Sequence, residues 1–499
     1  MSARSVAGAH RRTISVLDRR GLPPATADAE VVYFIPLDGG DWYFAELTDG
    51  TATGDLPAGN YIVQVRVRTP EADGSRSSTL VFLPDHTVDG DAGLVLDARR
   101  AVRLSASVDR ADARPTGGVA LLEQKVGGQA IGLAMMDLND YVTPAAAPGL
   151  AFGVQAQFTR NGATNGSPYV YNLAWTFPGI PDDLSLKART SELAAVRVRY
   201  GTQGLSACGG THQGALFGGL SVHLYTELGA LPATRTEYYT PGVEWSLDHG
   251  ITTPDCDFGW ENTDMTNRRT RFPRPGSYTL RWNTAPFGPA ASTAGWNPGA
   301  DPGGEPDLFV PMLSSWGTRS QIGPYAHMTG STVLRNARGE VVATTDLPGT
   351  GDIMVQPEAG THTLTVDAHR RAPWSDLAVR QHVRWTFTAR GTRDERPPLP
   401  VVRHRTALDD RNRARRGTTQ TIVMAAEGLP TGAEVRRLTL AASYDDGTTW
   451  TNITVRRSGE YWIADLPNSG GAYVSLRTTL ADSQGGAVEQ TVIRAYGLK

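Results

Sequence analysis

The stretch DGTATGDLPAGNYIVQVRVRT, from Asp49 to Thr69, contains the pattern that decides the fold. Its segment Leu56-Pro-Ala-Gly59 has the composition of a turn. After this turn apolar and polar residues alternate, so that one face of an extended strand carries Tyr61, Val63, Val65 and Val67. A period of two predicts a half-buried strand in an antiparallel sheet.

Short strands of the same kind continue on both sides of this stretch. Turn residues separate them at intervals typical of β-sandwiches, and no segment shows the period of an amphipathic helix. We therefore predict an all-β chain of tandem β-sandwich domains of the Ig-like type. The predicted parts are a basic N-terminal arm (1–12), a small β-sandwich (13–100), a central β-sandwich region of one or two subdomains (101–390), a charged linker containing Pro397 and Pro398 (391–417) and a C-terminal Ig-like sandwich (418–499).

Composition excludes several classes of protein. The 55 glycines and 32 prolines among 499 residues would interrupt any long helix or coiled coil. A disordered chain is excluded by 11 tryptophans, 40% hydrophobic residues and a net charge of only −3. No apolar run reaches the roughly 18 residues of a membrane span. Because acidic residues are interleaved with the basic ones, we expect no nucleic-acid partner.

The two cysteines, Cys208 and Cys256, fit one disulfide. The bond would close a loop of about 49 residues, which a chain-entropy model values at about 4 kcal/mol. Two unrelated buried thiols are the alternative, and a metal site is disfavoured because neither cysteine belongs to a CxxC pair. A disulfide would imply maturation outside the cytosol. However, no apolar signal segment follows the basic arm.

Serine-peptidase motifs are present only in part. The segment CGGTHQGALFGG (208–219) is similar to the histidine motif of subtilisins, but Gly209 occupies the position of the catalytic base. The segment GGLSVHL (218–224) fails the GxSxG pattern because His223 replaces the last glycine. We therefore predict no catalytic residue in this chain.

No cofactor is expected, and calcium is the one metal with candidate ligands. Asp89 and Asp91 flank a glycine in a loop rich in oxygen ligands, and Glu305 and Asp307 lie near other glycines. An ordinary Asp-Gly turn is the alternative for the first pair. The histidines are scattered and form no HExxH motif.

A single Asp-box motif, S-x-D-x-G-x-x-W, is formed by Ser443, Asp445, Gly447 and Trp450. The aspartate can accept hydrogen bonds from amides within the turn, the glycine permits positive φ, and the tryptophan can pack beneath the hairpin. Sialidase-like propellers repeat this box in each blade, whereas one copy indicates only a structural hairpin turn.

Several aromatic residues in turn-rich segments are candidates for stacking on carbohydrate or peptide ligands. They are Tyr238, Tyr239, Trp260 and Trp296. The alternative is that these rings pack in cores or beneath hairpins.

Three segments, RTEYYTPGVEW (235–245), YTLRWNTAPFGP (278–289) and the stretch from Gly470 to Leu498, resemble the C-terminal β-module region of secreted actinobacterial subtilisin-like serine peptidases. The first unit is similar to the carboxypeptidase-regulatory or prealbumin-like modules of such regions. In that family the catalytic domain precedes these modules, and no catalytic residue carries over to this chain.

The resemblance implies a non-catalytic extracellular accessory protein for adhesion, substrate engagement or structural support. Its expected partners are a subtilisin-like catalytic domain and a cell-surface or polymeric extracellular substrate. One alternative is a serine endopeptidase whose catalytic domain is encoded upstream, and another is a carbohydrate-binding module. Whether the chain takes part in an enzyme stays open at this point, and if it does, a subtilisin-like peptidase is the expected class.

Overall fold

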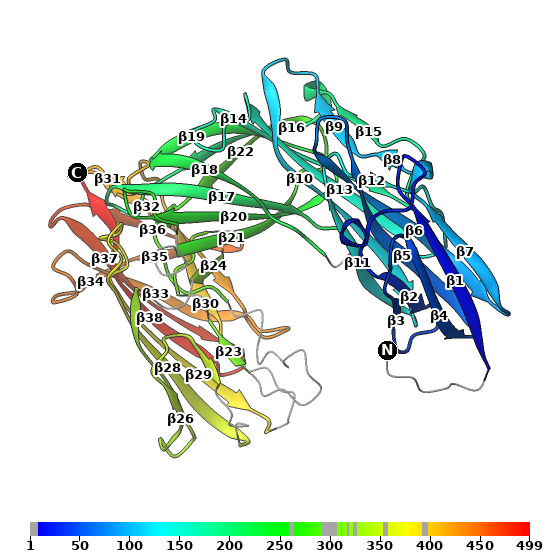
Figure 1. Cartoon of the computed structure of the whole chain (residues 1–499). Helices are drawn as coiled ribbons and strands as arrows, with labels where there is room; N and C mark the ends of the chain where they lie inside the picture. Colours follow the sequence, from blue (N-terminus) through cyan, green and yellow to red (C-terminus); the bar gives the residue numbers. More distant parts are fainter. Residues whose placement is uncertain are drawn as a thin grey trace.

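The computed structural model describes residues 8–218, 220–258, 264–291, 307–310, 312–316, 319–322, 327–352, 358–391 and 398–499. The predicted all-β fold is confirmed. In the described residues the helices are three single 3-10 turns, η1 (Thr26–Asp28), η2 (Ala98–Arg100) and η3 (Thr190–Glu192). In Figure 1 the blue strands near the N-terminus and the red strands near the C-terminus lie on opposite sides of the molecule, with the green strands between them.

The first sandwich consists of a three-stranded and a six-stranded sheet with a shared apolar core. The three-stranded sheet has the order β4 (Thr51–Pro57), β1 (Ala9–Leu17), β7 (Ala92–Asp97). The six-stranded sheet has the order β3 (Tyr43–Ala45), β2 (Val32–Pro36), β5 (Gly59–Pro70), β6 (Arg76–Val88), β12 (Tyr141–Val142), β8 (Val102–Arg103). Part of the expected basic arm thus lies within β1, where Arg12 is buried.

Strand β5 contains the alternating residues on which the fold prediction rests. It pairs antiparallel with β2 and β6, and Tyr61, Val63, Val65 and Val67 all face the core of the first sandwich. The expectation of a half-buried strand is wrong, however, because Ile62 on the other face is fully buried as well. A second core covers that face, and a strand pattern cannot show what packs on its polar side.

The second sandwich consists of a seven-stranded and a five-stranded sheet. The seven-stranded sheet has the order β11 (Gln129–Asp137), β10 (Ala113–Val126), β13 (Ala151–Arg160), β14 (Tyr169–Phe177), β19 (Ala233–Tyr239), β16 (Ala194–Tyr200), β22 (Gly276–Trp282). The five-stranded sheet has the order β18 (Leu224–Leu231), β17 (Ala207–Ala215), β20 (Glu244–Thr252), β21 (Asp264–Arg271), β24 (Arg319–Ile322). Strands β10 and β13 of the larger sheet also pack on the six-stranded sheet, so the first two sandwiches share a layer. A short sheet of β9 (Ser105–Val108) and β15 (Ser185–Ala188) lies beside it.

The third sandwich consists of a nine-stranded and a four-stranded sheet around the largest core cluster. The main path of the nine-stranded sheet is β26 (Val341–Thr345), β25 (Met328–Arg335), β28 (Gly360–Arg370), β29 (Arg380–Ala389), β38 (Ala487–Leu498), β37 (Tyr473–Asp482), β33 (Val435–Ser443), β34 (Thr451–Ile453), and β31 (Arg413–Ala414) pairs with β38. The four-stranded sheet has the order β30 (Val401–Arg405), β32 (Thr419–Glu427), β36 (Tyr461–Pro467), β35 (Val455–Ser458). Strands β23 (Asp307–Phe309) and β27 (Thr350–Asp352) form a separate pair.

The division into sheets differs from the division expected along the sequence. Strand β29, which precedes the expected linker, pairs antiparallel with β38, near the C-terminal end of the sequence. Within the expected linker, β30 pairs with β32 and is largely buried. Asn412 is 1% exposed and donates to the carbonyls of Thr202 (2.7 Å) and Asn283 (2.6 Å). The charged residues thus flank packed segments, which connect the second sandwich to the third.

Two buried glutamines join facing sheets as a neighbouring strand would. The Gln155 side chain in β13 donates to the Gln213 carbonyl (2.6 Å) and accepts from the Ala215 amide (2.8 Å) of the opposite sheet. The Gln490 side chain in β38 likewise donates to the Val402 carbonyl (2.6 Å) and accepts from its amide (2.9 Å). Each primary amide therefore satisfies one backbone donor and one backbone acceptor in a buried position.

Candidate functional site

The outer face of the five-stranded sheet contains the segment that is similar to the subtilisin histidine motif. Cys208, Gly210, His212 and Gly214 of β17 alternate with the inward-facing residues of that strand. A Cβ at Gly210 would lie 2.8 Å from the Tyr225 ring, and one at Gly214 would lie 2.5 Å from Ser221 Oγ. The glycines of this motif therefore leave room for side chains that lie across the sheet.

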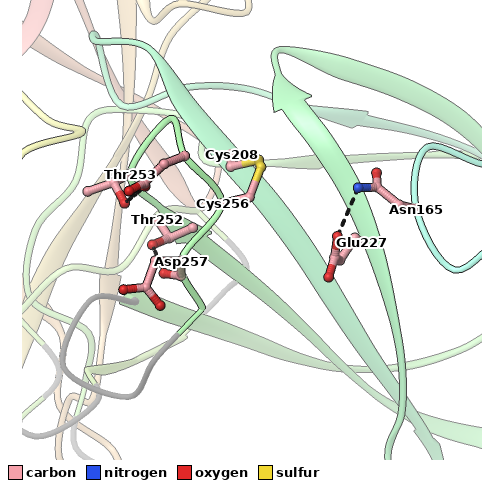
Figure 2. Close-up of a disulfide and its surroundings, with 8 residues drawn as sticks. Asn165, Cys208, Glu227, Thr252, Thr253, Cys256 and Asp257 are labelled. Carbon is pink, nitrogen blue, oxygen red and sulfur yellow. Dashed lines mark hydrogen bonds between the residues drawn. A yellow bond between two sulfur atoms is a disulfide. The ribbon is translucent and has the colours of Figure 1, made fainter.

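The predicted disulfide between Cys208 and Cys256 is present, with 5.1 Å between the Cα atoms. It attaches the loop after β20 to the outer face of β17, and Figure 2 shows the bond together with Thr252, the last residue of β20, and with Thr253 and Asp257 of that loop. Asn165, in the segment between β13 and β14, donates to the carboxylate of Glu227 on the neighbouring strand β18 over 2.9 Å. The disulfide therefore holds the loop that contains Cys256 against this face of the sheet.

A serine, a histidine and an aspartate meet on this face. His223 Nε2 lies 3.5 Å from Asp248 Oδ2, and a Cβ at Gly214 would contact both Ser221 Oγ and the Nε2 edge of His223. Burial raises the pKa of Asp248. A catalytic triad needs the aspartate on one ring nitrogen and the serine on the other. Here Asp248 lies at Nε2, and Ser221 Oγ has no hydrogen-bond partner among the described residues. The arrangement therefore lacks the geometry of a proton relay.

His212 lies beside this group but does not complete it. Its ring packs against Tyr225 with 4.7 Å between centroids, and its Nδ1 is buried without a partner in the described residues. Burial, with a smaller contribution from His223, lowers the pKa of His212. A neutral imidazole packed on an aromatic ring is suited to a structural or ligand-contacting role.

The candidate ligand aromatics are placed in different environments. Tyr238 is half-buried and stacks on Tyr171 with 4.4 Å between centroids. Tyr239 is fully buried, so the expectation that its ring could stack on a ligand is wrong. It faces the core because β19 alternates and only one residue of each adjacent pair points outward. Trp260 and Trp296 lie outside the described residues.

Tyr239 belongs to a buried polar cluster inside the second sandwich. Its hydroxyl and that of Tyr200 donate to the two carboxylate oxygens of Glu237, which also accepts from Arg235 Nε over 2.6 Å. Arg235 donates further to Thr211 Oγ1 (2.7 Å) and Thr226 Oγ1 (3.2 Å). Burial, reinforced by the Glu237 charge, raises the pKa of both tyrosines. All these side chains are buried, so we assign the cluster a structural role in the core of the second sandwich.

The Asp-box residues form a closed turn between β33 and β34. Asp445 accepts from the Thr449 amide (2.9 Å) and hydroxyl (2.6 Å), and these bonds lower its pKa to about 2. Gly447 has φ +90°, and Trp450 Nε1 donates to its carbonyl over 2.9 Å. Ser443 accepts from the Gly447 amide over 2.9 Å. The turn thus satisfies its own polar groups.

The calcium candidates are distributed over two regions. Asp91 Oδ1 accepts from the Arg11 amide over 2.7 Å, which connects the turn before β7 to β1. Asp89 is exposed in the same turn. Glu305 lies outside the described residues, and of Asp307 only the backbone, at the start of β23, is described.

Two exposed aromatic residues were not among the sequence candidates. Trp42, just before the edge strand β3, is 49% exposed, and Phe44, within that strand, is 46% exposed. The alternation in WYFAEL (42–47) indicates a strand with Trp42 and Phe44 on one face, but the segment is short and lies between turns. Tyr225, on the outer face of the five-stranded sheet, is also 37% exposed.

No family model matches the sequence, and no curated protein matches it. Among solved structures, a candidate adhesin from Bacteroides ovatus is 11% identical, with a TM-score of 0.17, over 38% of this chain and 96% of its own. The TIE protein of Bacillus anthracis is 12% identical, with a TM-score of 0.13, over 55% of this chain and 51% of its own. Salmonella alpha-2-macroglobulin reacted with methylamine is 9% identical, with a TM-score of 0.16, over 99% of this chain and 40% of its own. At such TM-scores these likenesses carry no argument about function.

No helix in the described part of the chain is long and apolar enough to span a membrane.

Proposed function

We propose that this chain is a non-catalytic extracellular protein that acts in adhesion, substrate engagement or structural support. The observation that carries the proposal is the Cys208–Cys256 disulfide within a continuous all-β framework. Disulfides persist in oxidising compartments and are rare in the cytosol. Packed sandwiches with short turns provide a rigid frame that displays surfaces to partners.

A finer proposal is that the chain serves a subtilisin-like peptidase as its accessory region. The resemblance of residues 235–245, 278–289 and 470–498 to the C-terminal modules of such peptidases supports it. In this proposal the partners are a subtilisin-like catalytic domain and a cell-surface or polymeric extracellular substrate. Co-purification of the chain with such a peptidase from the producing cells tests this step.

A serine peptidase is the second candidate, and one specific observation favours testing it. Ser221, His223 and Asp248 lie together on the outer face of the five-stranded sheet. The non-catalytic proposal predicts that a serine-reactive fluorophosphonate probe does not label the full chain. Stoichiometric labelling that disappears in Ser221→Ala would overturn it in favour of a hydrolase.

Calcium binding at Asp89 and Asp91 stays a separate prediction. The test compares the melting temperature with and without millimolar calcium. An unchanged melting temperature would refute the prediction of calcium binding.

A further inference from the structure

We propose that the outer face of strands β19, β16 and β22 binds polysaccharides of uronic acid, whose sugar units carry carboxylates. The contact residues are Thr236, Arg197, Arg199, Thr279 and Arg281, and we name these five the arginine face. The proposal rests on the proposed function, for which it specifies the chemical class of the polymeric extracellular substrate.

The strand register places the five residues of the arginine face side by side. Strands β19, β16 and β22 form one end of the seven-stranded sheet (Figure 1). Arg197 lies directly across from Thr236 of β19 and from Thr279 of β22. Arg199 lies directly across from Arg281 of β22. Since side chains alternate along a strand and the intervening residues face the core of the second sandwich, these five face outward.

The charge on this side of the three strands has one sign. Their outward-facing charged residues are Arg197, Arg199 and Arg281, and all three are exposed. The other outward-facing residues of these strands are threonine, serine, alanine and one tyrosine. The chain as a whole has a net charge of −3, so a local group of arginines without acidic neighbours on the same strands is a distinct feature. Such a surface attracts anionic ligands.

A carboxylate of this chain already binds to part of the arginine face. Asp410 Oδ1 accepts from Arg281 Nη2 over 3.1 Å, and Asp410 Oδ2 accepts from Arg199. Two arginines from adjacent strands therefore converge on one carboxylate, a group that matches the planar guanidinium. The structure thus shows which chemical group these side chains bind.

Arg197 is free to bind a further carboxylate. It lies two residues from Arg199 on β16, and it has no hydrogen bond or ion pair within the described part of the chain. A guanidinium has five N–H donors and no acceptor, so its natural partner is an anionic acceptor from outside. A ligand with several carboxylates could then contact Arg197 while it competes with Asp410 for the other two arginines.

The hydroxyl groups of the face favour a sugar polymer over other polyanions. Thr236 and Thr279 flank Arg197, and their hydroxyls can both donate to and accept from sugar hydroxyls. At the margin of the face, Tyr238 is half-buried and provides an aromatic ring for the C–H face of a sugar. A polymer that repeats carboxylates among hydroxyls matches both kinds of side chain.

Other occupants fit less well. A folded protein partner usually covers an interface with an apolar centre, whereas the outward-facing apolar residues here are Ala195 and Tyr238. Sequences that bind anionic membranes carry clusters of about 4–8 basic residues, and this face has three. A second copy of the chain would bring arginines against arginines, and like charges repel.

The test is titration of the full-length chain with polygalacturonate at low salt. The control ligand is the highly methyl-esterified polymer, which keeps the sugar and loses the charge. Binding to polygalacturonate, with little binding to the ester, is expected. Arg197→Gln should weaken binding at least about tenfold, because a hydrogen-bonded charge pair is lost. Since Arg197 is exposed, this variant should keep its melting temperature. The matched control is Arg384→Gln, which removes an exposed arginine from β29 of the third sandwich and should bind as the wild type does.

A second variant tests the face in the opposite direction. Asp410→Asn removes the charge that competes for Arg199 and Arg281, so it should bind polygalacturonate about threefold more tightly. A gain of binding cannot result from misfolding. Unchanged or weaker binding in this variant would show that these two arginines do not contact the polymer, and the arginine face as defined would be wrong.

Three further results would overturn the proposal: no binding to polygalacturonate, equal binding to the ester, or equal losses in Arg197→Gln and Arg384→Gln. Tighter binding to duplex DNA or to phosphatidylserine vesicles, lost in Arg197→Gln, would assign the face to a phosphate ligand and would also overturn it. Fluorophosphonate labelling is measured on the same samples. An unlabelled chain that does not bind polygalacturonate refutes the arginine face and leaves the proposed function in place.

Discussion

Arg235 Nε lies 2.6 Å from Glu237 Oε1, and neither side chain is more than 2% exposed. The two residues are two apart on β19, so both face the interior of the second sandwich. Two tyrosine hydroxyls donate to the Glu237 carboxylate, and two threonine hydroxyls accept from the Arg235 guanidinium. Such additional hydrogen bonds help to offset the cost of burying both charges.

Removing one partner of this pair should destabilise the chain strongly. We expect Glu237→Ala or Arg235→Ala to lower the free energy of unfolding by about 3–5 kcal/mol, because the other charge stays buried without compensation. Urea denaturation provides the measurement. The double variant should lose less than the sum of the single losses, which would reveal the coupling. Arg456→Ala, at the exposed pair with Asp465, is the control and should leave the midpoint nearly unchanged. Additive losses would contradict the assignment.

Stability should fall as the pH is lowered from neutrality, because two histidines are buried in neutral form. Burial lowers the pKa of His249 to about 3 and that of His404 to about 3, against 6.5 for an ordinary histidine. Between about pH 6.5 and pH 3 the unfolded chain binds protons that the native chain does not, so the stabilisation present above this window is lost within it. The slope is up to about 1.4 kcal/mol per pH unit for each histidine.

The measurement is the urea midpoint between neutral pH and about pH 4. His404→Gln should reduce the slope, since one titrating group is gone. His369→Gln, at an exposed position in β28, is the control. Equal slopes in all three proteins would show that His404 does not titrate on unfolding.

Reduction of the Cys208–Cys256 bond should lower stability by about 4 kcal/mol, the chain-entropy value for a closed loop of this length. The two cysteines are 48 positions apart. Melting temperatures with and without reductant give the difference, and Cys208→Ser/Cys256→Ser should match the reduced wild type. Titration of the non-reduced native protein should find no free thiol. Two free thiols would refute the bond and, with it, the extracellular assignment.

Gly447→Ala should destabilise the Asp-box hairpin by more than about 1 kcal/mol. Gly447 has φ +90°, and a Cβ there would lie 2.8 Å from Ile493 Cδ1. Gly485→Ala is the matched control, because Gly485 has φ +87° and open space around its Cβ position. The control carries the backbone strain without the clash, so the difference between the two variants measures the clash. Equal losses would mean that Ile493 moves aside.

Local patterns predicted much of this structure and failed where distant segments meet. The alternation around Tyr61 predicted β5, and the two-cysteine count predicted the disulfide, since each depends on few residues. No local pattern could predict that β29 pairs with β38, because the backbone N–H and C=O groups along a strand are the same whichever strand they pair with. Tyr239 was misjudged for a related reason: an aromatic residue beside a turn is as compatible with the core as with the surface.

The pairing of β29 with β38 also determines when the nine-stranded sheet can be completed during synthesis. During synthesis, β25, β28 and β29 leave the ribosome more than one hundred residues before β38, whose range is 487–498. Until then β29 has no neighbour on that side, and β37 lacks the same partner. Unpaired edges promote wrong associations. A nascent chain that stalls or is cleaved before residue 487 therefore presents two open edges to chaperones and proteases, and only a chain that contains β38 closes them.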